Sequence, residues 1–243
     1  MSHPLLQVQG VSKRFGGVQA LSDVGLNVLP GQVHGLIGPN GAGKTTFFNT
    51  ITGLVPVDAG RFELDGRAYK PNAVHRVAQA GIARTFQNIR LFADMTALEN
   101  VMVGRHIRTR SGVVGAMLRT GAFTAEEKAI AQRAQELLDY VGIGKFADYK
   151  ARTLSYGDQR RLEIARALAT DPQLIALDEP AAGMNMTEKV QLRELIDRIR
   201  RDDRTILIIE HDVKLIMGLC DRVTVLDYGK QIAEGTQIGR AHV

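Results

Sequence analysis

The sequence has a single cysteine, Cys220, and no apolar run that approaches the ~20 residues required for a membrane-spanning helix. One cysteine cannot form an intramolecular disulfide bond, which agrees with a reducing compartment. The first ten residues also lack the basic start and the long apolar core of a secretory signal peptide. Since 44% of the 243 residues are hydrophobic and 23% are charged, we expect a globular chain that does not itself cross a membrane.

Positive charge is in modest excess, and the excess lies in the middle of the sequence. Lysine and arginine number 31 against 26 acidic residues, which gives a net charge of +5. The segment from Arg84 to Arg166 has 14 basic and 9 acidic residues, whereas the remainder has 17 of each. A basic segment can contact nucleic acid or an anionic membrane, or it can simply form a solvated surface. Four of its arginines follow one another without an intervening acidic residue: Arg105, Arg108, Arg110 and Arg119.

Short apolar or alternating runs toward both ends of the sequence predict strands, and amphipathic stretches between them predict helices. The expected strands are 5–11, 24–29, 33–37, 61–64, 174–177, 205–209, 223–226 and 231–233. The expected helices at the two ends are 45–51 and 187–201.

Helical spacing replaces the strand patterns in the middle of the chain. The run Thr124–Glu127 has an N-cap residue followed three positions later by glutamate, so we expect a helix that begins at Thr124 and continues toward Tyr140. Another helix is expected over about 157–169. The patterns therefore predict one α/β domain over 1–243, in which 1–87 and 170–243 form the core and 88–169 form a helical insertion.

Residues 38–45, GPNGAGKT, match the pattern G-x-x-x-x-G-K-[ST] of a phosphate-binding loop between a strand and a helix. Glycines let the backbone wrap around a polyphosphate, and the following helix adds partial positive charge at its N-terminus. Lys44 is expected to reach the β and γ phosphates, and the Thr45 hydroxyl to ligate Mg²⁺. The pattern predicts binding of a nucleoside triphosphate. The residues expected to surround it are Gly38, Pro39, Asn40, Gly41, Ala42, Gly43, Lys44, Thr45 and Thr46.

The apolar run 174–177 ends in two acidic residues, Asp178 and Glu179. An aspartate at the carboxyl end of a core strand beside a phosphate loop can hold Mg²⁺, usually through a water molecule. Glu179 could then act as general base on an attacking water. Two acids at a strand end are by themselves more often only solvated, so this interpretation depends on the phosphate loop.

Residues 154–159, LSYGDQ, precede a predicted helix and resemble the signature motif of ABC-type ATPases, L-S-G-G-Q. Ser155 and Gly157 match the motif, whereas Tyr156 replaces a glycine and Asp158 replaces the glutamine. Ser155 is also an N-cap candidate, and the free N–H groups of a helix N-terminus suit a phosphate.

Other positions of the ABC pattern follow in order. Phe15 matches the aromatic residue that stacks on adenine, although the residue alone could equally lie in a strand core, and Val18 is expected to contact the nucleotide beside it. Gln87 matches the glutamine of the Q-loop. Pro180–Asn185 matches the D-loop, where aspartate is common at the last position. His211 matches the switch histidine that contacts the γ-phosphate.

The resemblance extends from about residue 5 to 235 and is closest to Liv-type ATP-binding subunits of branched-chain amino-acid importers. It implies a P-loop NTPase of the ABC ATPase fold, with a RecA-like core, an antiparallel β subdomain and a helical subdomain that carries the signature motif. The runs that carry it are RTFQNIRLF at 84–92, LSYGDQRRLEIAR at 154–166 and DEPAAGMN at 178–185. Such subunits usually continue for another short helix beyond the position of Val243.

The resemblance also implies a mechanism, in which two ATPase subunits close head to tail around two ATP molecules. Ser155, Gly157 and Asp158 of one subunit would then cover the γ-phosphate bound by the other. The implied catalytic residues are Glu179, which acts on the water, His211, Gln87 and Lys44. The implied ligands of Mg²⁺ are Thr45, Gln87 and Asp178.

The implied partners are a second ABC ATPase subunit, identical or different, two membrane permeases and, indirectly, an external solute-binding protein. The expected location is the cytoplasmic face of the inner membrane, with no nucleic-acid partner. The arginines from Arg105 to Arg119 would face anionic lipids or permease acids, unless they are only a solvated surface.

Three alternatives remain open at this point. The same ATPase could serve a urea or short-amide importer. A nucleic-acid-linked ABC ATPase is disfavoured, because the sequence has one phosphate loop and neither a coiled-coil nor a zinc-module pattern. A non-hydrolysing module is disfavoured by the presence of Lys44, Asp178, Glu179 and His211.

Overall fold

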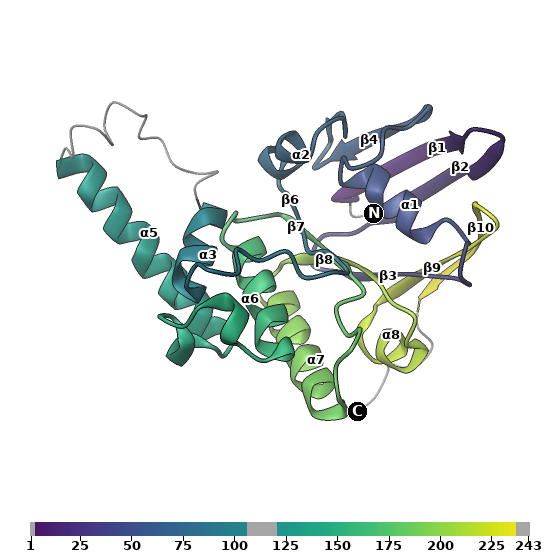
Figure 1. The fold of residues 1–243 in the computed structure, drawn as a ribbon. Helices are drawn as coiled ribbons and strands as arrows, with labels where there is room; N and C mark the ends of the chain where they lie inside the picture. Colours follow the sequence, from purple (N-terminus) through teal and green to yellow (C-terminus); the bar gives the residue numbers. More distant parts are fainter. Residues whose placement is uncertain (1–2, 106–120, 237–243) are drawn as a thin grey trace. The chain divides into compact units, whose positions relative to one another are not determined.

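The computed structural model describes residues 3–105 and 121–236, with side chains omitted for 121–124, and the chain divides into two compact units. The first unit comprises Met1–Gln87 and Gln173–Val243, and the second comprises Asn88–Pro172. Figure 1 shows strands in the first unit and helices in the second. The predicted α/β class is confirmed by these elements. Among the described helices, none is both long and apolar enough to cross a membrane.

An antiparallel sheet of four strands forms one layer of the first unit, in the order β2-β1-β4-β5. The strands are β1 (Leu6–Phe15), β2 (Val18–Val28), β4 (Ala59–Leu64) and β5 (Arg67–Ala68). The first two strands are longer than predicted, because they pair as far as Phe15 and Val18 at the turn of their hairpin. Register shifts within this pairing interrupt the alternation of apolar residues, so the sequence pattern fades before the strands end.

A second sheet of six strands has the order β10-β9-β3-β8-β7-β6. Its strands are β3 (Val33–Ile37), β6 (Ile82–Arg84), β7 (Leu174–Asp178), β8 (Thr205–Ile209), β9 (Arg222–Asp227) and β10 (Lys230–Thr236). All neighbours pair in parallel except β9 and β10, which form the predicted closing hairpin. Since β3, β8 and β7 are adjacent and parallel, the loops that follow them meet at one edge of the sheet.

Helices complete the first unit: α1 (Lys44–Ile51), α2 (Val74–Ala80), α7 (Met186–Arg201) and α8 (Val213–Leu219). Phe47, Phe48 and Ile51 of α1 are fully buried in a core cluster that includes residues of both sheets. Burial of three large apolar side chains is worth roughly 1.5–3 kcal/mol each, which anchors the helix directly after the glycine-rich loop.

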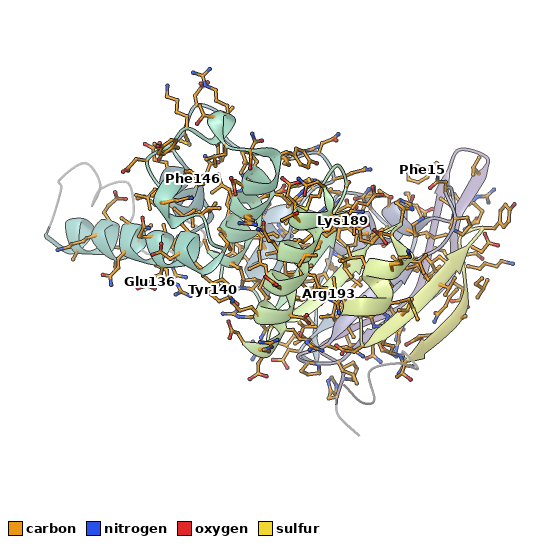
Figure 2. All side chains as sticks on the ribbon, turned by 90° about the horizontal axis from the view of Figure 1, so that it is seen from below. Phe15, Glu136, Tyr140, Phe146, Lys189 and Arg193 are labelled. Carbon is orange, nitrogen blue, oxygen red and sulfur yellow. The ribbon has the colours of Figure 1, made fainter. Side chains whose placement is uncertain are left out.

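The described part of the second unit is helical, with α3 (Ala97–Arg105), α5 (Gly121–Tyr140) and α6 (Tyr156–Leu168), and two short 3₁₀ turns, η2 (Gly144–Phe146) and η3 (Ala151–Thr153). Helix α3 packs against α5 and α6. The predicted helix start at Thr124 is wrong, because α5 is already helical at Gly121 and Thr124 lies inside it. Figure 2 shows Glu136 and Tyr140 on this helix.

The arginine-rich stretch is described only at its first residue. Arg105 ends α3, and its guanidinium pairs with the Asp171 carboxylate of the same unit. Arg108, Arg110 and Arg119 lie outside the described residues. The charge of Arg105 is therefore already partly matched by an acidic side chain.

Candidate active site

The glycine-rich loop joins β3 to α1 and borders a cavity of about 780 Å³ in the first unit. Gly38 and Gly43 have φ values of 149° and 95°, which favour glycine. A side chain at Gly38 would also overlap the carbonyl oxygen of Leu226. The loop therefore depends on glycine both for its backbone angles and for its contact with the end of β9.

Many of the predicted nucleotide-binding and catalytic residues line this cavity. They are Val18, Asn40, Gly41, Ala42, Gly43, Lys44, Thr45, Thr46, Gln87, Glu179 and His211. Gly38 and Pro39 are not among the lining residues, but their carbonyl oxygens hold the lysine of the loop.

Lys44 lies folded back into its own loop. Its Nζ atom donates hydrogen bonds to the carbonyl oxygens of Gly38, at 2.8 Å, and Pro39, at 2.9 Å. Burial lowers the pKa of the Lys44 ammonium, and the negative charge of Glu179 opposes this shift. An ammonium held among carbonyl oxygens at the cavity wall is suited to attract phosphate oxygens.

The first turn of α1 presents Thr45 and Thr46 to the cavity. Gly43 precedes the helix and supplies no side-chain cap, so the early N–H groups of the helix are not capped by that residue. Such a helix N-terminus carries partial positive charge, which adds to that of Lys44.

Glu179 accepts hydrogen bonds from two other predicted site residues. Gln87 donates through Nε2 to Oε2 of Glu179 at 2.8 Å, and Nε2 of His211 lies 2.7 Å from Oε1. Glu179 has a φ of 44°, an uncommon value for a residue other than glycine. Its backbone N–H is fixed by the carbonyl oxygen of Ile209 at the end of β8, at 3.0 Å. The sheet edge thus brings together three residues that are far apart in the sequence.

Asp178, at the end of β7, is 3% exposed and is not among the residues that line the cavity. Arg84 of β6 donates a hydrogen bond to its Oδ2 atom at 2.7 Å. No role for Arg84 could be predicted, although it lies three residues before Gln87, because a basic residue in a strand carries no signal of its ion-pair partner. Among the described residues, no three His, Cys, Asp or Glu side chains cluster as a metal site.

Phe15 was expected either to stack on adenine or to lie buried in a strand core, and the structure excludes the second. Phe15 is 49% exposed near the turn of the β1–β2 hairpin, so the alternative of a buried strand residue is wrong (Figure 2). It does not line the cavity, whereas Val18 does. The Nζ atom of Lys13 lies 5.4 Å from the centre of its ring. Stacking of Phe15 on adenine stays a prediction.

Tyr228 and Gly229 also line the cavity, and the sequence indicated only a turn at their position. Tyr228 is 87% exposed and has a φ of 45°. A turn pattern reports backbone geometry and not what the turn faces, so no sequence signal could have assigned this residue to the cavity.

The residues of the signature-like motif belong to the second unit, at the start of α6. Ser155 is the N-cap: its Oγ atom accepts a hydrogen bond from the Asp158 N–H at 3.2 Å. The Ser155 hydroxyl also donates to Oδ2 of Asp158 at 2.7 Å. The predicted N-cap role of Ser155 is confirmed, and Gly157 lies buried in the first turn. Asp158 thereby places a carboxylate at a helix N-terminus that would otherwise suit a phosphate.

The segment 180–185 ends in the N-cap of α7. Asn185 accepts a hydrogen bond from the N–H of Glu188 at 3.0 Å, and the Glu188 carboxylate accepts one from the N–H of Asn185 at 2.9 Å. This capping box explains why asparagine is suitable at the position where the ABC pattern often has aspartate.

Comparisons with known proteins agree with this geometry. The family model described as ABC transporter matches residues 21–182. The protein is 44% identical over 237 residues to the high-affinity branched-chain amino acid transport ATP-binding proteins BraF of Pseudomonas aeruginosa and LivG of Escherichia coli K12, a match that covers 97% of this chain and 93% of each relative.

Solved structures give the same result. The ADP conformation of MJ1267, an ATP-binding cassette of an ABC transporter, has a TM-score of 0.84 at 31% identity and covers 97% of this chain and 92% of that chain. The dimeric post-hydrolysis state of the ATP-binding cassette MJ0796, bound to ADP and Pi, has a TM-score of 0.80 at 26% identity and covers 96% of this chain and 99% of that chain. Because the family model matches most of the sequence and the relatives align over nearly all of it, the chain belongs to the ABC transporter family.

Proposed function

We propose that this chain is the ATP-binding and ATP-hydrolysing subunit of an importer of branched-chain amino acids. One observation carries the proposal: Lys44, the first turn of α1 and the Glu179 carboxylate surround a single cavity. Groups that attract phosphate and a group that can take a proton from water therefore face the same space. The choice of cargo is supported by the 44% identity to BraF and LivG, which are named for branched-chain amino acid transport.

Glu179 is the general base in this proposal, and Gln87 and His211 control it. Each of the two carboxylate oxygens accepts a hydrogen bond from one of these side chains. Each oxygen has a second lone pair, so these two contacts orient the carboxylate and leave it able to accept a proton from water. A γ-phosphate that contacts Gln87 or His211 would therefore affect how the Glu179 carboxylate is held and so link binding to hydrolysis.

Magnesium fits the donor set of this site. Thr45 offers a hydroxyl and Asp178 a carboxylate, which are the hard oxygen ligands that Mg²⁺ prefers, and Gln87 offers an amide oxygen. Because Asp178 is buried and paired with Arg84, it would act on the ion through a water molecule. Bound there, the ion would neutralise charge on the phosphates.

The two compact units are, in this proposal, the core and the helical subdomain of one ABC ATP-binding domain. Ser155, Gly157 and Asp158 would cover the γ-phosphate bound by a second ATPase subunit. The assembly further contains two permeases in the inner membrane, which receive solute from an external solute-binding protein, and this chain lies at the cytoplasmic face of that membrane. The N–H groups of the first turn of α6 support this role, whereas the negative charge of Asp158 at the same helix start opposes it.

The Glu179→Gln variant tests the chemistry. We expect ATP hydrolysis to fall by ~100-fold or more while ATP binding is retained, because glutamine keeps the size of the side chain but cannot accept the proton. Glu136→Gln, which removes an exposed carboxylate from α5, is the matched control. Unchanged hydrolysis in the Glu179→Gln variant would reject the assignment of the base.

Uptake by cells that lack the subunit tests the cargo. Wild-type protein should restore uptake of labelled leucine, isoleucine and valine, and the Glu179→Gln variant should not. Restoration of urea uptake without any effect on these amino acids would reject the cargo while leaving the ATPase assignment in place.

A further inference from the structure

Glu210 is a buried carboxylate in the loop between β8 and α8, directly before His211. Its side chain accepts a hydrogen bond from the N–H of Ala181 at 2.7 Å and another from the N–H of His211 at 3.1 Å. The residue is 5% exposed. Among the described residues, no salt bridge includes Glu210. Its hydrogen bonds therefore come from backbone N–H groups.

The buried carboxylate of Glu210 does not favour stability, so its presence points to another role. Burial raises the pKa of Glu210, hydrogen bonds from the backbone of Ala181, His211 and Asp212 oppose this shift, and the negative charge of Glu179 adds to it. The charge of Lys189 interacts with that of Glu210, but no salt bridge among the described residues joins them. A buried charge that is held mainly by backbone N–H groups is costly compared with an apolar side chain of similar size. Packing alone does not account for a glutamate here.

The two N–H groups belong to the two loops that carry Glu179 and His211. Ala181 lies two residues after Glu179, in the segment 180–185, and the Glu179 carbonyl oxygen accepts a hydrogen bond from Ala182 at 3.1 Å. His211 directly follows Glu210. The loops of Glu179 and His211 are thus joined twice. One link is the contact of 2.7 Å between the His211 ring and the Glu179 carboxylate, and the other runs through the Glu210 carboxylate.

We propose that Glu210 is a positioning residue for ATP hydrolysis, which ties the segment 180–185 to His211 and so holds the His211 ring against Glu179. The proposal rests on the function proposed above in one respect, namely that Glu179 is the general base. The carboxylate offers an acceptor oxygen to each loop, which a neutral side chain of the same size does not. Movement of the segment 180–185 would consequently be passed to His211.

The Glu210→Gln variant tests the link without ATP. Glutamine has one acceptor oxygen and an NH₂ group, so one of the two backbone N–H groups would face a donor. We expect hydrogen exchange at the amides of Ala181 or His211, measured by NMR, to accelerate by ~10-fold or more. Glu99→Gln is the matched control, because it also removes a carboxylate that accepts a backbone hydrogen bond, from Thr96 at 2.7 Å in the second unit. Unchanged exchange at both amides would overturn the proposal.

Kinetics test whether the link acts through His211. In Glu210→Gln, we expect kcat to fall by ~10-fold with little change in the KM for ATP, because the phosphate-binding loop is untouched. In a His211→Ala background the same substitution should lower kcat by less than ~2-fold, since the ring that it positions is gone. Full additivity of the two substitutions would overturn the proposal.

A second variant covers the case in which Glu210→Gln does not fold. Glu210→Asp keeps the charge but withdraws the oxygens by one methylene, so it should lower kcat in the wild-type background. In the His211→Ala background, Glu210→Asp should lower kcat by less. Absence of ATP hydrolysis by the wild-type protein would reject the proposed function. Hydrogen exchange at the amides of Ala181 and His211 tests the connection through Glu210 independently of hydrolysis.

Discussion

The guanidinium of Arg84 lies against the carboxylate of Asp178, with Nη2 and Oδ2 separated by 2.7 Å and the two side chains 7% and 4% exposed. Its Nη1 atom donates to Oδ1 of Asn49 and Oγ1 of Thr52, both at 2.6 Å. The ring of Phe48 stacks near it, 4.8 Å from the guanidinium carbon. Arg84 therefore joins strand β7 to the end of the helix that follows the phosphate-binding loop.

We expect Arg84→Met to lower the free energy of unfolding by about 3 kcal/mol, because it leaves the buried Asp178 carboxylate without its cationic partner. Urea unfolding measures the change. Arg61→Met is the control, since Arg61 is an exposed residue of β4. Equal stabilities of the two variants would show that the ion pair contributes little. Arg84→Lys should be intermediate, because an ammonium keeps the charge but not the planar set of donors.

Asp158 stands where the ABC signature motif has glutamine, and this difference leads to a second prediction. Its carboxylate accepts the Ser155 hydroxyl and adds negative charge at the start of α6. In Asp158→Gln the N-cap can persist, while the repulsion of a γ-phosphate is removed. We therefore expect the ATP-driven association of two ATPase subunits to tighten by ~5-fold. The same change should lower stability by about 0.5 kcal/mol, because an acidic residue favours a helix N-terminus.

Sedimentation in the Glu179→Gln background, where ATP is not consumed, measures this association. Asp148→Gln is the control, since it removes the same charge from an exposed position of the second unit. Weaker association of Asp158→Gln than of the control would contradict the role proposed for this carboxylate.

The sequence patterns that predicted the site best were those that specify both the residue types and their order. The pattern at 38–45 and the apolar run before Asp178 and Glu179 located the loops that meet at the edge of the six-stranded sheet. Parallel pairing brings those loops together wherever the strands are adjacent, so the cavity follows from the motifs and the α/β class. Strands β7 and β8 are uniformly buried, which explains why continuous apolar runs predicted them well.

What the sequence could not indicate depends on tertiary contacts. Strand β6 has three residues, too few for a periodic pattern, yet it carries Arg84. Asp178, Asn49 and Thr52, which pair with Arg84, and Ala181, which pairs with Glu210, lie far from them in the sequence, and no local pattern specifies these contacts. The predicted helix start at Thr124 failed because a capping pattern describes one favourable local state, which a longer helix can override.

His34 gives a prediction on pH dependence. Burial lowers its pKa from 6.5 to about 4, opposed by the charge of Glu234. The unfolded chain therefore takes up a proton between pH 6.5 and pH 4 and the folded protein does not, so stability is present above pH 6.5 and is lost as the pH falls. The loss from this residue is about 3 kcal/mol and stops below pH 4.

Urea unfolding at pH 7 and pH 4 measures this contribution. His34→Gln should reduce the loss of stability between the two pH values by about 3 kcal/mol, because glutamine does not titrate. His75→Gln, at an exposed position of α2, should reduce it far less. The same pH dependence in His34→Gln as in the wild-type protein would show that other groups dominate.

Substitution of two glycines of the phosphate-binding loop can distinguish the effect of backbone strain from that of steric overlap. Gly38 and Gly41 both have φ values that favour glycine, 149° and 80°. A side chain at Gly38 would overlap the carbonyl oxygen of Leu226, whereas one at Gly41 meets no heavy atom within 4 Å. Gly41→Ala should therefore cost about 1 kcal/mol from strain alone and leave a loop that still binds ATP.

Gly38→Ala should be more damaging, because either the loop or the end of β9 has to move. We expect a loss of stability of about 3 kcal/mol and a fall in ATP affinity of ~10-fold or more, since displacement of the loop also moves the carbonyl oxygens that hold Lys44. Urea unfolding and titration with a fluorescent ATP analogue measure the two effects. If the two alanine variants bind ATP equally well, contact with Leu226 is not what fixes the loop, and its geometry is set by the backbone conformation of the glycines alone.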